Sequence, residues 1–138
     1  MEVMVSAFLL IVGMLAILIT YNHAMELSEM SRNISLAVRG AKSRMETIKN
    51  TDPAQMSANF HNVSFTIPNI NGMGKSYIDD VTDPDLIQII VNFSWRDKRG
   101  RVIGEDLDLD GVLDGGEDQN ANGRLDSPVE LTTQIFTG

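Results

Sequence analysis

Hydrophobic residues form one uninterrupted run at the start of the chain. After Glu2, no charged residue occurs from Val3 to Tyr21. As an α-helix this run is about 28 Å long, close to the hydrocarbon thickness of a membrane. A single carboxylate beside such a run is costly in lipid and is usually retained for a purpose. The first Lys or Arg is Arg32, so we expect Glu2 to meet a chain terminus, a lipid headgroup or another molecule.

The apolar run continues into a segment with helical periodicity. Apolar residues recur there along one stripe, which we expect to contact a sheet: Leu27, Ile34, Val38, Ala41, Met45 and Ile48. The charged residues between them, including Arg44, are expected to face water. The first proline is Pro53, which disfavours helix at the residue before it. The pattern predicts one helix over 1–50, apolar all round in 1–21 and amphipathic in 22–50.

Residues 51–138 are predicted to form a globular domain that begins with a short helix. Asp52 is placed to cap a helical turn that runs to about Phe60. Residues 69–85 contain several Gly, Asn, Asp and Pro residues. That composition predicts a loop, with one short strand near Tyr77.

Alternation of apolar and polar residues predicts the strands of this domain. They are 63–67, 86–95, 101–103 and 129–135. A turn at 97–100 joins the strongest strand to its return arm, and residues 104–128 interrupt that arm as an insert. The predicted fold class is therefore α+β, with a long N-terminal helix packed on a small antiparallel sheet.

The acidic residues of the chain gather in this insert. Among 138 residues with a net charge of −8, the segment from Glu105 to Glu130 holds nine of the 19 acids and one of the 11 bases. The chain has no cysteine, which excludes disulfides and a thiol nucleophile. Neither His23 nor His61 lies in an acid–base or zinc-binding spacing. We therefore expect no enzymatic activity.

The insert contains two consecutive calcium-loop patterns of twelve residues each. Such a loop offers oxygen ligands at positions 1, 3, 5, 9 and 12 and a backbone carbonyl at position 7, with glycine at position 6 for the turn. The first loop supplies Asp106, Asp108, Asp110, Val112, Asp114 and Glu117. The second supplies Asp118, Asn120, Asn122, Arg124, Asp126 and, one residue late, Glu130. Because the second loop has fewer charges and Val129 at position 12, we predict one Ca²⁺ site and a second, weaker one.

The two loops abut and leave no room for the helices that flank paired EF-hands. We therefore interpret them as calcium loops within a β-sheet insert. The alternative is a solvated acidic loop without a cation. Mg²⁺ fits less well, because a large cage of protein oxygens suits the larger and more flexible ion. Without a cation, the crowded carboxylates should repel one another and leave the insert disordered, so bound ions would stabilise the fold.

The N-terminus resembles that of type IV pilins and of the pseudopilins of type II secretion. The resemblance is carried by the sequence Glu2-Val3-Met4-Val5-Ser6-Ala7 and by Gly13-Met14-Leu15 within the apolar run. Residues 41–48, 91–97 and 129–135 look like the minor-pilin branch. The resemblance extends over nearly the whole chain except the calcium insert.

This resemblance implies export behind a basic leader, cleavage by a prepilin peptidase and methylation of the new N-terminus. It further implies storage in the inner membrane and assembly, with copies or related pilins, into a helical filament outside the cell or in the periplasm. Glu2 would meet the N-terminal amine of a neighbouring subunit. The chain departs from the family in two places. Family members carry a few residues before the one that matches Met1, and many have proline near Ile19.

The predicted function is that of a structural subunit of a pilus-like or pseudopilus filament with a calcium-stabilised outer domain. Motility, adhesion and secretion are equally open as its role. The alternative is a membrane-anchored, calcium-dependent adhesion or binding module that does not polymerise, with residues 3–21 as a plain signal anchor. A basic cluster could bind DNA, but such turns are more often solvated, and nucleic acid is not favoured as a partner. That cluster is Arg96, Lys98, Arg99 and Arg101.

Overall fold

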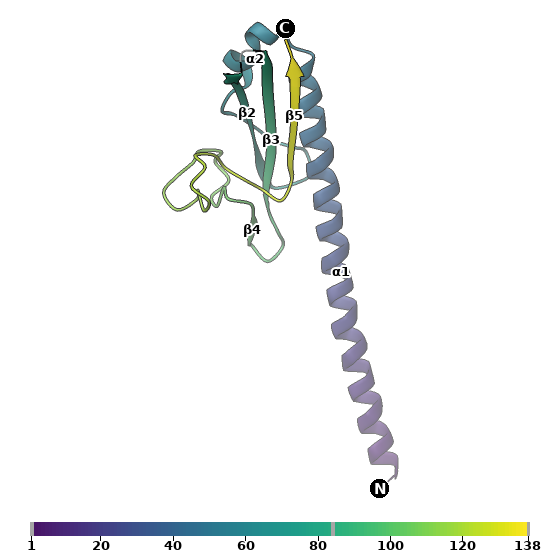
Figure 1. Cartoon of the computed structure of the whole chain (residues 1–138). Coiled ribbons are helices and arrows are strands. Elements are labelled where there is room, and N and C mark those ends of the chain that lie inside the picture. Colours follow the sequence, from purple (N-terminus) through teal and green to yellow (C-terminus); the bar gives the residue numbers. More distant parts are fainter. Residues whose placement is uncertain (1, 84, 138) are drawn as a thin grey trace. The chain divides into compact units, whose positions relative to one another are not determined.

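The computed structural model describes residues 2–83 and 85–137 of the chain. It comprises two compact units, Met1–Asn33 and Ile34–Gly138. Helix α1 (Glu2–Lys49) forms the whole described part of the first unit and continues into the second (Figure 1). The predicted helix is confirmed in extent. Its first residue, Met1, and the proline of the predicted loop, Pro84, lie outside the described residues.

The short second helix is also confirmed, as α2 (Pro53–Phe60). Asp52 is its N-cap, and a side-chain oxygen of Asp52 accepts a hydrogen bond from the backbone N–H of Ala54 at 3.1 Å. Pro53 occupies the first helical turn, where its missing N–H costs no helical hydrogen bond. The same proline that prevents continuation of α1 therefore begins α2.

The globular unit contains one antiparallel sheet of five strands. They are β1 (Val63–Phe65), β2 (Gly72–Asp83), β3 (Leu86–Arg96), β4 (Val102–Ile103) and β5 (Glu130–Phe136). The long strand β3 pairs with β2 along one edge and with β4 and then β5 along the other. The predicted hairpin turn is present, because the backbone N–H of Asp97 donates to the carbonyl of Arg101 at 2.8 Å. The return arm is interrupted as predicted, with the acidic insert between β4 and β5.

The strand predicted near Tyr77 is present, but the prediction of a loop for most of residues 69–85 was wrong, because Gly72–Asp83 forms β2. Its glycines indicated turns, but they lie where the sheet is tightly packed. A methyl group on Gly72 would lie 2.7 Å from Phe93 Cε1 and 2.9 Å from Trp95 Cα, and one on Gly74 would overlap the ring of Phe65. Glycine is therefore required by close packing in this strand rather than by a turn.

Replacing Gly72 by alanine is expected to destabilise the globular unit by about 1–3 kcal/mol, because the added methyl meets neighbouring backbone, which cannot move aside cheaply. The free energy of unfolding, measured by urea titration, tests this. Gly115→Ala is the matched control, since nothing lies within 4 Å of its added methyl. Equal stability of the two variants would contradict the packing explanation.

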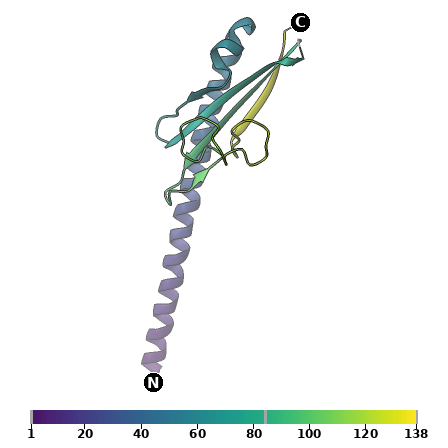
Figure 2. The ribbon, with the colours of Figure 1, turned by 90° about the vertical axis from the view of Figure 1, so that its left-hand side faces the viewer.

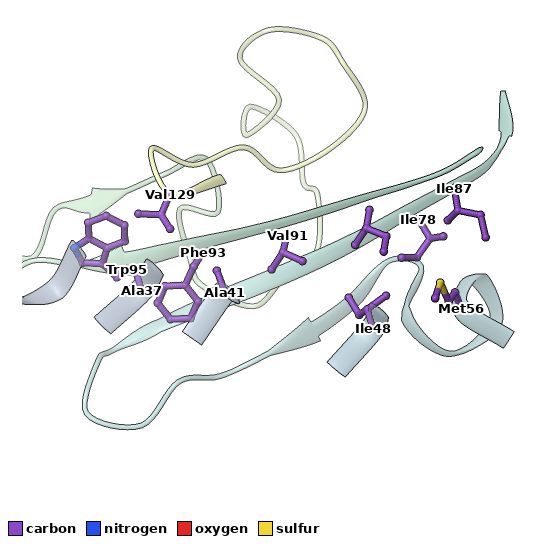
Figure 3. Close-up of a cluster of buried hydrophobic side chains, with 11 residues drawn as sticks. Ala37, Ala41, Ile48, Met56, Ile78, Ile87, Val91, Phe93, Trp95 and Val129 are labelled. Carbon is purple, nitrogen blue, oxygen red and sulfur yellow. The ribbon is translucent and has the colours of Figure 1, made fainter. Parts of the chain in front are cut away.

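The hydrophobic core lies between the C-terminal part of α1 and one face of the sheet (Figure 3). The alternating residues of β3 that were predicted to share a face all point into it. The buried members of the core are Ala37, Ala41, Ile48, Met56, Ile78, Ile87, Ile89, Val91, Phe93, Trp95 and Val129. The single tryptophan, Trp95, is 1% exposed and is a spectroscopic probe of this core.

The contact stripe on α1 differs in part from the predicted one. Ala41 and Ile48 are buried and Met45 packs against the core, but Leu27 is 68% exposed and Ile34 and Val38 are 36% and 38% exposed. Two of the three buried residues of α1, Ala37 and Ala41, are small, and the third is Ile48. A close helix–sheet approach selects small side chains at its centre and leaves larger ones at its margin.

Arg44 was predicted to face water and is instead half-buried. Its guanidinium carbon lies 4.8 Å from the centre of the Phe60 ring and 5.3 Å from that of the Phe65 ring. Burial lowers the pKa of Arg44 below its ordinary value. The aliphatic stem and planar head of arginine explain why it replaces an apolar residue at this edge of the core.

The acidic insert covers the sheet face opposite the α1 segment of this unit (Figure 2). The polar residues on that face of β3 are consequently buried, with Asn92 and Ser94 each 2% exposed. Lys75 of β2 is 6% exposed and donates to the carbonyl of Gly111 in the insert. The globular unit is therefore a three-layer arrangement of helix, sheet and insert.

Candidate functional site

The two predicted loops of the insert, 106–117 and 118–129, adopt the same backbone conformation at equivalent positions. At position 4, Leu109 and Ala121 have φ angles of 65° and 57°. At position 6, Gly111 and Gly123 have φ angles of 76° and 77°. Left-handed conformations are uncommon for residues other than glycine. Their recurrence at an interval of twelve residues shows that the sequence repeat is also a structural repeat.

In the first loop, carboxylates turn inward and accept hydrogen bonds from the loop's own backbone. The two oxygens of Asp106 accept from the N–H groups of Asp110 at 3.1 Å and Gly111 at 3.0 Å. Asp108 accepts from Asp110 at 3.2 Å, and Asp110 accepts from Val112 at 2.7 Å. These contacts hold the side chains at positions 1, 3 and 5 on the inside of the turn.

The second loop repeats these contacts twelve residues later. Asp118 accepts from the N–H groups of Asn122 at 2.9 Å and Gly123 at 2.8 Å. Asn120 accepts from Asn122 at 3.1 Å, and Asn122 accepts from Arg124 at 3.0 Å. Asparagine therefore supplies the same inward oxygen as aspartate, without its charge.

Acidic groups of the first loop lie close enough together to hold a metal ion. One group consists of Asp106, Asp108 and Glu117, and an overlapping one consists of Asp108, Asp110 and Asp114. Within each group, one oxygen from every carboxylate lies within 4.8 Å of the others. Between them, the two groups include all five predicted side-chain ligands of this loop, and they share Asp108. Oxygen ligands in such numbers are suited to a hard cation such as Ca²⁺.

Two of these carboxylates are buried, which is unusual for ionised groups. Asp106 is 2% exposed and Glu117 is 4% exposed. Burial raises the pKa of Asp106 above its ordinary value, against the backbone hydrogen bonds that lower it, and the nearby charge of Glu117 raises it further. Two adjacent buried carboxylates are costly without a compensating positive charge. A bound cation would supply that charge.

The carboxylate of Glu117 contacts two separate parts of the first loop. Its Oε1 accepts from the N–H of Leu107 at 2.8 Å, and its Oε2 accepts from the N–H of Asp114 at 3.0 Å. These are positions 2 and 9 of the loop. A glutamate at position 12 that lies across the loop in this way can offer both oxygens to one cation.

Glu105 makes the equivalent contacts in the second loop. Its Oε1 accepts from the N–H of Gln119 at 3.3 Å, and its Oε2 accepts from the N–H of Asp126 at 3.0 Å. Gln119 and Asp126 are positions 2 and 9 of the second loop. Glu105 therefore has the place in the second loop that Glu117 has in the first.

The calcium-loop pattern did not identify Glu105, because the ligand at position 12 was expected after Asp118, where the residue is Val129. The signal was present, since Glu105-Asp106 recurs as Glu117-Asp118. A glutamate thus precedes each loop, and the glutamate before the first loop contacts the second.

Glu130, the acid proposed to complete the second loop, lies beside that loop at the start of β5. Its Oε1 lies 3.6 Å from Nη2 of Arg124. Burial raises the pKa of Glu130 above its ordinary value, the charge of Arg124 lowers it, and the charge of Asp126 and a side-chain hydrogen bond with Asp126 raise it again. Val129, at position 12 of the repeat, is 5% exposed and belongs to the hydrophobic core.

Asp126 is the centre of the second loop. Side-chain amides of Asn120 and Asn122 donate to its Oδ2 at 2.6 Å and 2.7 Å, and Nε of Arg124 donates to its Oδ1 at 3.1 Å. Burial would raise the pKa of Asp126, but these hydrogen bonds and the arginine charge hold it below its ordinary value. The predicted ligands at positions 3, 5 and 9 of this loop therefore meet at the Asp126 carboxylate, whereas Asp118 at position 1 accepts from the loop backbone.

No protein-family model matches the chain, and searches of curated proteins and of solved structures also return no match.

The first unit presents a second functional feature, an exposed apolar helix. Its large apolar side chains between Val3 and Tyr21 are 47–82% exposed. An 18-residue window of α1 has a mean hydropathy of 2.8, so by length and composition this helix can cross a membrane. A signal sequence meets the same criteria of length and composition. Glu2 lies in the first turn of the helix, where the positive end of the helix dipole stabilises a carboxylate.

Proposed function

We propose that this protein is a structural subunit of an extracellular or periplasmic filament of the type IV pilin kind. It would assemble through its apolar N-terminal helix and carry a globular unit stabilised by calcium. The observation that carries the proposal is the uncharged helical segment from Val3 to Tyr21, preceded by the lone acid Glu2.

The exposed helix of the first unit must be covered by something apolar. Burying one large aliphatic or aromatic side chain contributes about 1.5–3 kcal/mol. Val3–Tyr21 holds many such side chains, all exposed. Lipid covers them before assembly, and the helices of neighbouring subunits cover them in a filament. The second environment also provides a cation for Glu2, namely the terminal amine of an adjacent subunit.

We further propose that the insert binds two calcium ions, one in each loop. The supporting observations are the repeated loop conformation, the inward carboxylates of the first loop, and the buried pair Asp106 and Glu117. In the second loop, Glu105 would supply the bidentate ligand in place of Glu130. The cation in that loop would still be bound more weakly, because two asparagines replace aspartates.

The alternative function is a membrane-anchored, calcium-dependent binding module that does not polymerise. The same exposed helix supports this reading, since it is long enough to serve as an anchor. The two functions predict different assemblies. Electron microscopy of native material should show filaments if the first proposal is right. Monomers in detergent, with no polymer under any assembly condition, would favour the anchored module.

Glu105→Gln is expected to weaken calcium binding by the second loop by about tenfold or more, because the loop loses its only bidentate acid. Glu130→Gln is the comparison variant and should weaken that affinity less than Glu105→Gln does, because Glu130 lies outside the twelve-residue repeat, beside Arg124 and Asp126. Isothermal titration in an Asp108→Ala background, which disables the first loop, isolates the second site. Greater loss of affinity in Glu130→Gln than in Glu105→Gln would contradict the assignment.

A further inference from the structure

The backbone of Leu125 attaches the second loop to the sheet. The N–H of Leu125 donates to the hydroxyl oxygen of Tyr77 at 2.8 Å, and the carbonyl of Leu125 accepts from the side-chain amide of Asn92. Nearby, the hydroxyl of Ser127 donates to the carbonyl of Phe93. Leu125 is 1% exposed and Asn92 is 2% exposed, so both polar backbone groups of Leu125 are held by side chains in a dry environment.

Tyr77 and Asn92 come from adjacent strands of the same sheet face. In the register of β2 and β3, Tyr77 is opposite Ile90, and Asn92 is opposite Lys75. The two side chains are therefore diagonal neighbours, and the backbone N–H and carbonyl of Leu125 bridge them. The contact joins the insert to the longest strand pair of the sheet.

Leu125 directly precedes Asp126, whose carboxylate accepts hydrogen bonds from other side chains of the second loop. Asp126 is bonded through its N–H to Glu105 and through its carboxylate to Asn120 and Asn122. Burial raises the pKa of Tyr77, the hydrogen bond from Leu125 lowers it, and the charge of Asp126 raises it again. The phenol therefore stays neutral beside the loop and remains a hydrogen-bond acceptor for Leu125.

We propose that Tyr77 and Asn92 are positioning residues of the second calcium loop. They act through the backbone of Leu125, which fixes the position from which the side chain of Asp126 enters the loop. Cation binding and the pairing of β2 with β3 are coupled through this contact. The inference rests on the proposed calcium binding and adds two residues that lie outside the calcium-loop pattern.

Coupling between docking of the loop and cation binding explains how such a clamp affects affinity. Contacts that form together with the bound state add to its stability, so losing them lowers the apparent affinity for the cation. Without a cation, repulsion among the carboxylates opposes the docked conformation of the insert. The clamp should consequently form together with the bound state and contribute little without calcium.

The test is Tyr77→Phe in the full chain in detergent, with Tyr21→Phe as the matched control. Melting is followed by near-ultraviolet circular dichroism of Trp95, in calcium chloride and in chelator. We expect Tyr77→Phe to lower the Tm by about 3–10 °C in calcium and by no more than about 1 °C in chelator. Its calcium affinity in the second loop should fall by about threefold to tenfold. Tyr21→Phe should match the parent protein in both conditions.

Asn92→Ser provides an independent variant, because its shorter side chain does not reach the Leu125 carbonyl. It should show the same loss of Tm, in calcium only. The Tm of the double variant should fall by less than the sum of the two single losses, since both residues hold the backbone of Leu125. An equal drop in Tm with and without calcium would show that Tyr77 is merely structural and would overturn the proposal. No change in either condition would overturn it too. A parent protein whose Tm does not respond to calcium would instead refute calcium binding itself.

Discussion

Removing calcium with a chelator is expected to lower the Tm of the globular unit by about 10 °C or more, and added calcium should restore it. A ligand at one hundred times its dissociation constant stabilises the folded state by about 2.7 kcal/mol per site. In a domain of this size, each kcal/mol corresponds to a Tm change of about 4–8 °C. The first loop alone is therefore sufficient for the expected shift.

The effect should reach the whole globular unit because the insert is part of its structure. Gly111 of the first loop accepts from Lys75, and Leu125 of the second contacts Tyr77 and Asn92. Loss of the docked insert would expose the buried ammonium and amide of the sheet and remove their hydrogen-bond acceptor. Unfolding of the insert is consequently coupled to unfolding of β2 and β3.

Asp106→Asn combined with Asp108→Asn tests which residues carry the response. This double variant should lose most of the calcium-dependent rise in Tm, whereas Glu46→Gln, an exposed acid on α1, should keep it. Magnesium at the same concentration should be a poor substitute, because it prefers a small octahedral shell with several waters. Superimposable melting curves in chelator and in calcium would refute calcium binding by the insert.

Glu2→Ala is expected to abolish or severely reduce filament assembly while the globular unit stays folded. A carboxylate among apolar helices is costly unless it meets a positive charge, and the terminal amine of a neighbour can provide one. Alanine removes that pairing and leaves the neighbour's amine without a partner. The yield of polymer, measured by sedimentation and electron microscopy, reports the loss.

Glu26→Ala is the control for this experiment, because Glu26 lies on the same helix but beyond the apolar run. It should assemble at close to the normal yield. Near-ultraviolet circular dichroism of Trp95 should be unchanged in both variants, since the core of the globular unit lacks Glu2 and Glu26. Normal polymer from Glu2→Ala would remove Glu2 from the assembly mechanism.

Local sequence determined the helices and the inner frame of each loop. The helix α1 follows from its periodicity and from the proline at position 53, and the cap of α2 follows from Asp52. The side chains at positions 1, 3, 5 and 9 lie within nine consecutive residues, so their spacing alone turns them toward the inside of the loop. These features depend on neighbours in the chain, and a linear pattern therefore predicts them.

Tertiary structure decided the strand β2, the partners of the second loop and the docking of the insert. Gly72 and Gly74 indicated a turn, yet they are glycines because Trp95 and Phe65 pack against them. Glu105 reaches the second loop because folding brings its backbone beside Asp126, where the N–H of Glu105 donates to the carbonyl of Asp126 at 2.9 Å. Contacts between residues far apart in sequence depend on the arrangement of whole elements, and the spacing of residues does not encode that arrangement.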